Sequence, residues 1–459
     1  MDKTERLRSL PGIDRILATD AAKHLKVGWS GAIYDDEVRA LVAELRARIQ
    51  DGADPGTSTP AELAEQAGAR LARRLDRGVR RCINATGVVL HTGLGRAALP
   101  AAAIEAIERE IGSGYSVVSI NREEGTRIRR ESAVARLLCA LTGAEAATVV
   151  NNNAAATLIG LNTLAGGREA ILSRGQLVEI GGSFRMPDVF VAAGVALREV
   201  GTTNRTRASD YEAAIGDQTG LLLRVHPSNF KVIGFTEEVD IAGLVELGRK
   251  HRIPVMDDLG AGALVALPPE PVISDSLKAG ADLLTCSGDK LIGGPQSGII
   301  LGRRIWVDRV RRNPLFRTLR VDKLTLAALE ATLRLFLRRD GPGADHPTLH
   351  MLQLSLDAIA KRARTLRTRL AKDVAAVGVE IVDGYSQVGS GSLPGENLPT
   401  KLLSIAHPTL KSSAFAKRLR LSDPPIYTRI VDDKVCLDPR TLRPGDDKDI
   451  VRILQELTR

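Results

Sequence analysis

The sequence contains no apolar run approaching the roughly 18 residues that a membrane-spanning helix needs. Its charged first residues lead into no apolar segment, so we expect no secretory signal. The four cysteines have no paired spacing, and no cluster of cysteine and histidine indicates a metal site. These absences predict a soluble, cytoplasmic protein with reduced thiols, without bound metal and without a membrane partner.

The chain has an excess of positive charge, with a net charge of +9 and a pI of about 9.5. Residues 301–340 hold eleven Lys/Arg against four Asp/Glu, whereas the first eighty residues are nearly balanced. Arginine-rich usage in a GC-rich genome would account for the excess as a whole. The clustering instead indicates an anionic substrate, because phosphate-bearing molecules bind to concentrated positive charge.

The length of 459 residues predicts about three domains. Thr59 and Glu62 form a capping-box pattern with Pro60 at the first helical position, which predicts a helix to about Arg80. The turn-forming residues 51–58 before it are a candidate hinge. We predict a helical N-terminal domain, a linker helix, a large domain and a small C-terminal α+β domain, over residues 1–58, 59–82, 83–340 and 341–459.

From Ile83 onward, short β-rich runs alternate with helical stretches. This spacing is typical of βα units whose strands are buried in a mostly parallel sheet. The fold class expected is therefore α/β. The predicted strands are 146–150, 169–172, 189–193, 219–225, 253–256, 283–286 and 298–301.

Lys290 follows the predicted strand 283–286 and precedes a glycine-rich loop. A lysine just past a strand end can enter a cleft, lose part of its hydration and become nucleophilic as its pKa falls. Ser287, three residues before the lysine, is placed to bind a phosphate. A solvated turn is the alternative interpretation of the same residues.

Two carboxylates, Asp257 and Asp258, end the preceding strand. A carboxylate there could pair with a protonated pyridine nitrogen and strengthen the ring as an electron sink. We assign that position to Asp257, the first residue past the apolar run, and expect Asp258 to point elsewhere. A metal-binding acidic turn and an Asx turn are the alternatives.

Asn152, Asn153 and Ala154 lie between a predicted strand and a helix of small residues. The exposed N–H groups of such a helix start bind a phosphate well. Together with Asp257 and Lys290, this segment lies at strand carboxyl ends, where open α/β sheets bind their ligands. The combination predicts pyridoxal phosphate held by Lys290 as a Schiff base. An asparagine-capped helix without any ligand is the alternative for this segment.

Arginines near these segments are candidates for binding an anionic substrate, because guanidinium groups hold phosphate-like oxyanions with two hydrogen bonds each. Solvated helix faces are the alternative. The candidates are Arg96, Arg127, Arg130, Arg317 and Arg320.

With these residues in hand, the sequence resembles the bacterial L-seryl-tRNA(Sec) selenium transferases, also called selenocysteine synthases. The resemblance runs essentially from end to end. It rests on residues 10–15, 83–88, 94–96, 142–147 running into 151–156, 179–185, 200–206, 287–296, 322–330 and 391–394.

The resemblance implies a fold-type I enzyme dependent on pyridoxal phosphate. It implies β-elimination of the serine hydroxyl from seryl-tRNA(Sec), then addition of selenium from selenophosphate, with Lys290 as Schiff-base partner and base. Asp289 matches a functionally important family acid. Arg96, Arg317 and Arg320 match positions proposed to bind the selenium donor. The further family arginine falls on Arg127 or Arg130.

For the assembly, the resemblance implies an N-terminal domain that docks the tRNA, and subunits assembled as a ring of dimers, a homodecamer. The chain departs from the usual family pattern at Gly93 and Ala133, near the expected donor pocket. Two alternative functions are a fold-type I lyase acting on a small amino acid or amino sugar, and a basic RNA-binding protein whose cofactor site has decayed. The intact Ser287, Lys290, Asn151–Asn153 and Asp257 speak against decay.

Overall fold

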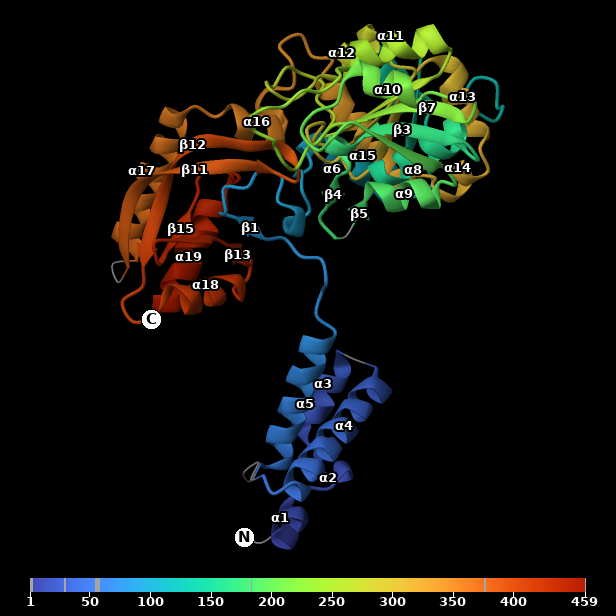
Figure 1. The fold of residues 1–459 in the computed structure, drawn as a ribbon. Helices are drawn as coiled ribbons and strands as arrows, with labels where there is room; N and C mark the ends of the chain where they lie inside the picture. Colours follow the sequence, from blue (N-terminus) through green and yellow to red (C-terminus); the bar gives the residue numbers. More distant parts are fainter. Residues whose placement is uncertain (1–2, 29, 54–57, 183, 375–376, 459) are drawn as a thin grey trace. The chain divides into compact units, whose positions relative to one another are not determined.

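A computed structural model describes residues 3–28, 30–53, 58–182, 184–374 and 377–458. The chain folds as two compact units, Met1–Arg81 and Cys82–Arg459 (Figure 1). Among the described residues, no helix combines the length and apolar character that crossing a bilayer requires.

The N-terminal unit is a bundle of helices around its own hydrophobic core. Ile16, Tyr34, Val38 and Leu63 are fully buried in this core, and the Tyr34 hydroxyl donates a hydrogen bond to the carbonyl of Ala64 at 2.9 Å. The helices are α1 (Lys3–Ser9), α2 (Ile13–Leu17), α3 (Asp20–Val27), α4 (Gly31–Gln50) and α5 (Pro60–Arg74).

The predicted linker helix belongs to this bundle. The capping box at Thr59 and Glu62 is present, with both reciprocal hydrogen bonds. However, α5 packs against α2, α3 and α4 through buried residues that include Leu63 and Leu71. The linker assignment for 59–82 was therefore wrong, because α5 has an apolar face that is buried within the unit. Residues 54–57 of the predicted hinge lie outside the described residues.

The second unit is built on a seven-stranded sheet of order β2-β10-β9-β8-β7-β3-β6. β9, β8, β7, β3 and β6 pair in parallel, and β10 runs antiparallel to both of its neighbours. The predicted mostly parallel sheet is confirmed. The strands are β2 (Ala146–Val150), β3 (Glu169–Ser173), β6 (Ala196–Val200), β7 (Thr219–Val225), β8 (Val255–Gly260), β9 (Leu283–Ser287) and β10 (Gly298–Gly302).

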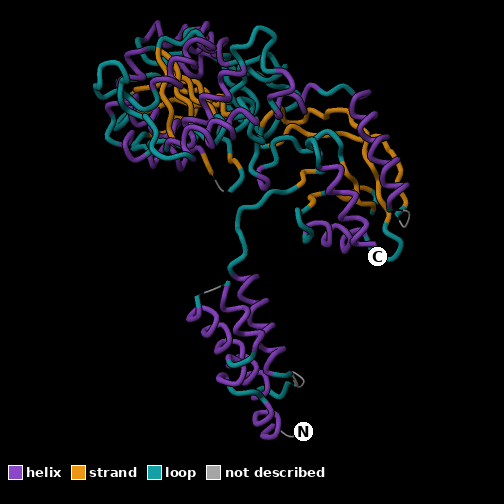
Figure 2. The backbone as a smooth tube through the Cα atoms, turned by 180° about the vertical axis from the view of Figure 1, so that it is seen from behind, coloured by secondary structure: helices purple, strands orange, loops and turns teal. Residues whose placement is uncertain are grey.

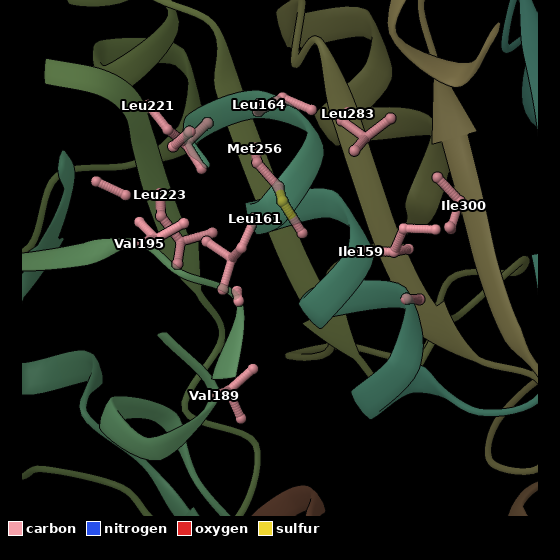
Figure 3. Close-up of a cluster of buried hydrophobic side chains, with 14 of the residues drawn as sticks. Ile159, Leu161, Leu164, Val189, Val195, Leu221, Leu223, Met256, Leu283 and Ile300 are labelled. Carbon is pink, nitrogen blue, oxygen red and sulfur yellow. The ribbon is translucent and has the colours of Figure 1, made fainter. Parts of the chain in front are cut away.

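Helices surround this sheet (Figure 2). On one face, α8 (Asn153–Ala165) packs its Ile159 and Leu161 into a cluster that contains Met256 and Leu283 of the strands (Figure 3). The helices α9 (Met186–Ala192) and α13 (Arg304–Arg312) contribute to the same cluster. The other face is covered mainly by α7 (Ser132–Thr142), α10 (Ala208–Ala214), α11 (Ile241–His251), α12 (Ile273–Ala279) and α15 (Lys323–Leu335).

One predicted strand was wrong. Residues 189–193 fall mainly in α9, which has Pro187 and Asp188 in its first turn, both favourable to a helix start. Phe190 and Val189 are buried as part of a helical face instead of a strand. The strand follows at β6, after a left-handed turn at Gly194.

The C-terminal region contains a smaller antiparallel sheet of order β11-β12-β15-β14, which packs with helices around a second core. Its elements are β11 (Gly378–Gly389), β12 (Ser392–Ala406), β14 (Arg429–Val431), β15 (Lys434–Leu437), α17 (Leu356–Asp373), α18 (Ser412–Arg420) and α19 (Asp446–Thr458).

The first strand after the N-terminal unit also joins this C-terminal region. β1 (Ile83–Asn84) pairs in parallel with β13 (Ile426–Tyr427), and Ile83 is buried in the C-terminal core. The predicted boundary that placed residue 83 in the large domain was therefore wrong. The cause is a pairing between residues more than 340 positions apart, which local sequence patterns do not reveal.

Candidate functional site

A cavity of about 410 Å³ lies where β7, β8 and β9 reach their carboxyl ends and α8 begins. Three of the predicted segments meet there. The lining residues include Arg96, Asn152, Asn153, Ala154, His226, Ser228, Asp258, Ser287, Asp289 and Lys290. This position agrees with the rule that parallel sheets bind ligands at the carboxyl ends of their strands.

Lys290 is 4% exposed and lines this cavity. Burial lowers the pKa of its amine, and the positive charge of Arg96 lowers it further. Asp258, Asp289 and Glu270 oppose this shift. The balance favours a larger fraction of neutral amine than an exposed lysine has, and the neutral amine is the form that attacks a carbonyl carbon.

Asp258, and not Asp257, faces the cavity. Asp258 accepts hydrogen bonds from Asn153 at 2.8 Å, Thr157 at 2.9 Å and Thr285 at 3.0 Å. Burial raises the pKa of its carboxyl, and these hydrogen bonds and Lys290 counteract the shift. A buried carboxyl held by neutral donors can form an ion pair with a cationic ring nitrogen.

The structure does not bring Asp257 to the cavity, where the sequence placed it. Successive residues of a strand point to opposite faces, so Met256 and Asp258 share the α8 side while Asp257 points to the other side. There its two carboxylate oxygens receive hydrogen bonds from Nη1 of Arg224, at 3.1 and 3.3 Å. Burial raises the pKa of Asp257, and Arg224 acts against that rise.

The start of α8 provides a cradle for an anion. The Asn152 side chain caps the helix by accepting a hydrogen bond from the Ala155 N–H at 2.8 Å. The N–H groups of Asn153 and Ala154 have no partner within the helix and lie at the cavity. Gly298 allows β10 to pass close by, because a Cβ there would lie 1.9 Å from the Asn152 carbonyl oxygen.

Asp289 and Arg96 form an ion pair at the cavity wall. Nη1 of Arg96 lies 2.7 Å from Oδ2 of Asp289, and Arg96 has a left-handed backbone with a φ of 62°. Asp289 is 6% exposed and Ser287 is 5% exposed, and both line the cavity. The structure thus brings Arg96, Ser287, Asp289 and Lys290 together at one cavity.

The remaining predicted arginines do not line the cavity of this chain. Arg127, Arg317 and Arg320 are exposed, and their charges lie close enough to lower the pKa of Arg130, whose partial burial is the larger cause. Arg130 also donates a hydrogen bond to the Val321 carbonyl at 3.2 Å. These four residues form a positively charged group, here called the arginine cluster.

The prediction missed His226, Ser228 and Glu270. His226 and Ser228 directly follow β7, so polar residues at that strand end were a usable signal. Glu270 lies in a loop that no strand pattern marks. Cys286 packs on the far side of β9 in a hydrophobic cluster, where burial raises the pKa of its thiol.

Comparisons with known proteins identify the family. Residues 82–443 match the model of the L-seryl-tRNA selenium transferase family. The chain belongs to this family. It is 45% identical to the L-seryl-tRNA(Sec) selenium transferase of Geotalea daltonii, with 98% of both chains covered. It is 44% identical to that of Alkaliphilus metalliredigens, over 100% of this chain and 99% of the relative.

Among solved structures, a D-glucosaminate-6-phosphate ammonia-lyase aligns with a TM-score of 0.58 and 19% identity. The alignment covers 84% of this chain and 98% of the lyase. At this identity the likeness concerns the fold alone. It places this member of the selenium transferase family in the α/β architecture that the sequence predicted.

The residues at the cavity fit pyridoxal phosphate. The buried Lys290 would offer an amine to its aldehyde, the start of α8 would offer N–H groups to its phosphate, and Asp258 would offer a carboxylate to its ring nitrogen. In addition, Oδ1 of Asn153 is buried without a hydrogen-bond partner among the described residues. Such an atom at a cavity wall is typical of a site that holds a ligand.

Proposed function

We propose that this protein converts seryl-tRNA(Sec) to selenocysteinyl-tRNA(Sec), using pyridoxal phosphate bound to Lys290 and selenophosphate as the selenium donor. The observation that carries the proposal is the buried Lys290 beside Asp258 and the start of α8, in a chain about 45% identical to named selenium transferases over its full length. A cytoplasmic location is part of the proposal, because charged tRNA is used there.

Bound pyridoxal phosphate would supply an electron sink for the charge left when a proton is removed from the serine α-carbon. Asp258 would keep the ring nitrogen protonated, Ser287 and the α8 N–H groups would hold the phosphate, and Lys290 would hold the aldehyde carbon. Nζ of Lys290, once released by the substrate amine, is placed to take the α-proton. The serine hydroxyl would take up a proton and leave the β-carbon as water. The selenium of selenophosphate would then bond to that carbon while the α-carbon regains a proton, and attack of water on phosphorus would break the selenium–phosphorus bond and release phosphate.

Arg96 and Asp289 would control the approach of the selenium donor. Selenophosphate carries several negative charges, and a guanidinium binds such oxyanions through two parallel hydrogen bonds. Arg96 currently pairs with Asp289 at 2.7 Å. We infer that Asp289 keeps the guanidinium oriented toward the cavity until the donor arrives.

The arginine cluster and a nearby apolar segment support assembly into an oligomer. Tyr115, Val117 and Ile120 are more than half exposed, which is unusual for large apolar side chains outside an interface. We propose that a second copy covers this segment and that the subunits form a ring of dimers. In that arrangement Arg317, Arg320 and either Arg127 or Arg130 would bind the donor. Light scattering of the purified protein tests the assembly.

For the N-terminal unit, we propose docking of tRNA(Sec). Two observations support this role. The relatives are named for a tRNA(Sec) substrate, and the N-terminal unit has its own hydrophobic core, as a separate binding domain does. Preference for tRNA(Sec) over tRNA(Ser), lost when residues 1–70 are deleted, is the expected result. Equal binding of both tRNAs would contradict this role.

The test of the activity is incubation of the full-length protein with seryl-tRNA(Sec) and selenophosphate, followed by mass analysis of the amino acid released from the tRNA. We expect selenocysteine from the wild type. Replacing Lys290 by alanine should lower the rate by about three to four orders of magnitude and abolish the visible absorption of the bound cofactor.

The matched control is Lys278→Ala, since Lys278 is an exposed lysine of α12 whose ion pair is with Asp275 on the same helix. It should retain both activity and absorption. Turnover of free serine as fast as of the charged tRNA would contradict the proposed function, and would favour an amino acid lyase instead.

A further inference from the structure

A second cavity, of about 440 Å³, adjoins the first and shares His226 with it. It lies beside the ends of β3 and β7, and Leu393 at the start of β12 also lines it. Residues that matter for its chemistry are Thr202, Arg205, Phe230, Lys231 and Glu270. None of them has a step in the reaction proposed for Lys290, and Glu270 acts on that lysine only through its charge.

Glu270 is the inner group of this second cavity. It is 6% exposed, and its Oε2 accepts a hydrogen bond from the Leu393 N–H at 3.3 Å. Its Oε1 is buried without a hydrogen-bond partner among the described residues, and the Nε2 atom of His226 lies 3.9 Å from it. A buried carboxyl oxygen without a partner costs free energy, so this atom is suited to a ligand hydroxyl.

The charge state of Glu270 suits contact with a neutral hydroxyl group of a ligand. Burial raises its pKa to about 7, and the positive charge of Lys290 acts against that rise. His226, which faces Glu270, has its pKa lowered to about 4 by burial and by the positive charges of Arg224 and Lys290. Near neutral pH the Glu270 carboxyl therefore exists in both forms and can accept or donate a hydrogen bond.

The outer part of the second cavity combines an aromatic ring with positive charge. Phe230 has 37% of its surface exposed, and Lys231 and Arg205 line the same cavity. Two acidic residues, Glu237 and Glu238, also line it, and Glu237 is paired with Arg207 at 3.1 Å. Nζ of Lys231 lies 3.9 Å from Oε1 of Glu396, a loose ion pair that a phosphate can displace. An exposed ring stacks on a nucleobase, and a lysine binds a phosphate.

We propose that this second cavity binds the 3′-terminal nucleoside of the substrate tRNA, with its ribose at Glu270, its base on Phe230 and its phosphate near Lys231. The inference rests on the proposed function. In an aminoacyl-tRNA the amino acid is esterified to a hydroxyl of the terminal ribose, so the ribose lies one ester bond from the seryl group. The free neighbouring hydroxyl is then available for Oε1 of Glu270.

The first test uses adenosine 5′-monophosphate as the probe, with the full-length protein loaded with pyridoxal phosphate. Saturable binding is expected in calorimetry. Phe230→Ala should weaken binding about tenfold through loss of stacking. The matched control is Phe235→Ala, an exposed ring of the same loop that contacts Arg205 but does not line the cavity. Equal binding by both variants and wild type, or no saturation in the millimolar range, would overturn the proposal.

The second test locates the ribose. Glu270→Ala should weaken binding of adenosine 5′-monophosphate about tenfold, because a hydrogen bond to a buried group is lost. It should leave the affinity for the 2′,3′-dideoxy analogue nearly unchanged. If Glu270→Ala does not fold, Glu270→Gln, which keeps an acceptor for the Leu393 N–H, serves in its place. A similar loss for both nucleotides would refute the contact between ribose and Glu270.

The two proposals can fail separately. Cofactor absorption and selenocysteine formation report on the proposed function, whereas nucleotide binding reports on the second cavity alone. If the wild type makes selenocysteinyl-tRNA but does not bind the nucleotide, only the second-cavity proposal is wrong. If it binds the nucleotide and forms no selenocysteine, the proposed function is wrong and the cavity binds nucleosides for another purpose.

Discussion

The two sides of β8 place neighbouring carboxylates in opposite electrostatic environments. On the α8 side, Asp258 is held by one amide and two hydroxyl groups, next to Lys290. On the other side, Asp257 receives two hydrogen bonds from the guanidinium of Arg224, and it also has a hydrogen bond with the side chain of Ser276. Both carboxylates are almost completely buried, so burial alone does not distinguish a catalytic position from a structural one.

The difference lies in which charges are already neutralised. The charge of Asp257 is matched by Arg224 within the protein, so no ligand is needed there. The charge of Asp258 is stabilised by neutral donors and by the more distant Lys290, so a cationic ligand atom would complete its environment. A buried charge without a committed counter-ion at a cavity is therefore the better mark of a functional site.

Exchanging these carboxylates for amides tests the comparison most strongly. Asp258→Asn should lower kcat/KM by about a thousandfold, because the cofactor ring would lose its charged partner. Asp257→Asn should leave kcat/KM within a few fold of the wild type. Steady-state kinetics on seryl-tRNA(Sec), together with the absorption spectrum of the cofactor, give the measurement.

The opposite ranking would break the comparison and restore Asp257 as the ring partner. Glu246→Gln, at an exposed carboxylate of α11 that lines neither cavity, is a suitable control and should leave kcat/KM unchanged. The absorption spectrum of each variant shows whether the cofactor is still bound. A variant that keeps the cofactor absorption but loses activity has lost the activation of the cofactor and not the cofactor itself.

Most of the sheet and the main cofactor segments were predictable from the sequence, because each depends on a short local pattern. Ser287 and Asn153 lie at the end of a strand and the start of a helix, and Lys290 follows that strand by three residues. The predicted ends of these elements were therefore enough to identify the three residues. The choice between Asp257 and Asp258 was not predictable in this way. Both follow the same apolar run, and only the packing of α8 against the sheet shows which face is the cavity.

Other features depended on contacts between distant residues. Ile83 joins the C-terminal core through β13, and Glu270 reaches the second cavity from an irregular loop. Neither has a periodic pattern around it. The members of the arginine cluster were chosen from the sequence, and they lie close to one another in the structure. They do not line the first cavity of this chain, because nearness in sequence to a predicted site segment does not decide which side chains reach the cavity.

The far side of β8 should matter for stability more than for catalysis. Arg224→Met should lower the free energy of unfolding by about 3 kcal/mol, because Asp257 would remain buried without its counter-ion. The double variant Arg224→Met, Asp257→Leu should regain most of this loss. Urea denaturation followed by circular dichroism measures both. A double variant as unstable as the single one would show that the guanidinium acts through other contacts.

The smallest effect concerns the response of stability to pH. The pKa of Glu270 is raised from 4.5 to about 7 in the folded protein, so the folded state holds this proton more tightly than the unfolded state. Its contribution to stability should therefore fall as pH rises between these values, by at most about 1.4 kcal/mol per pH unit. His226, whose pKa is lowered from 6.5 to about 4, contributes the opposite slope between those two values.

Because the two slopes overlap, the wild type alone does not separate them. The difference between wild type and Glu270→Gln isolates the Glu270 contribution, since glutamine does not titrate. We expect Glu270→Gln to gain stability relative to the wild type as the pH is raised from 5 toward 7. Urea unfolding at a series of pH values measures this difference. A constant difference would mean that the folded and unfolded states bind the Glu270 proton equally, so that burial does not raise the pKa of this carboxyl.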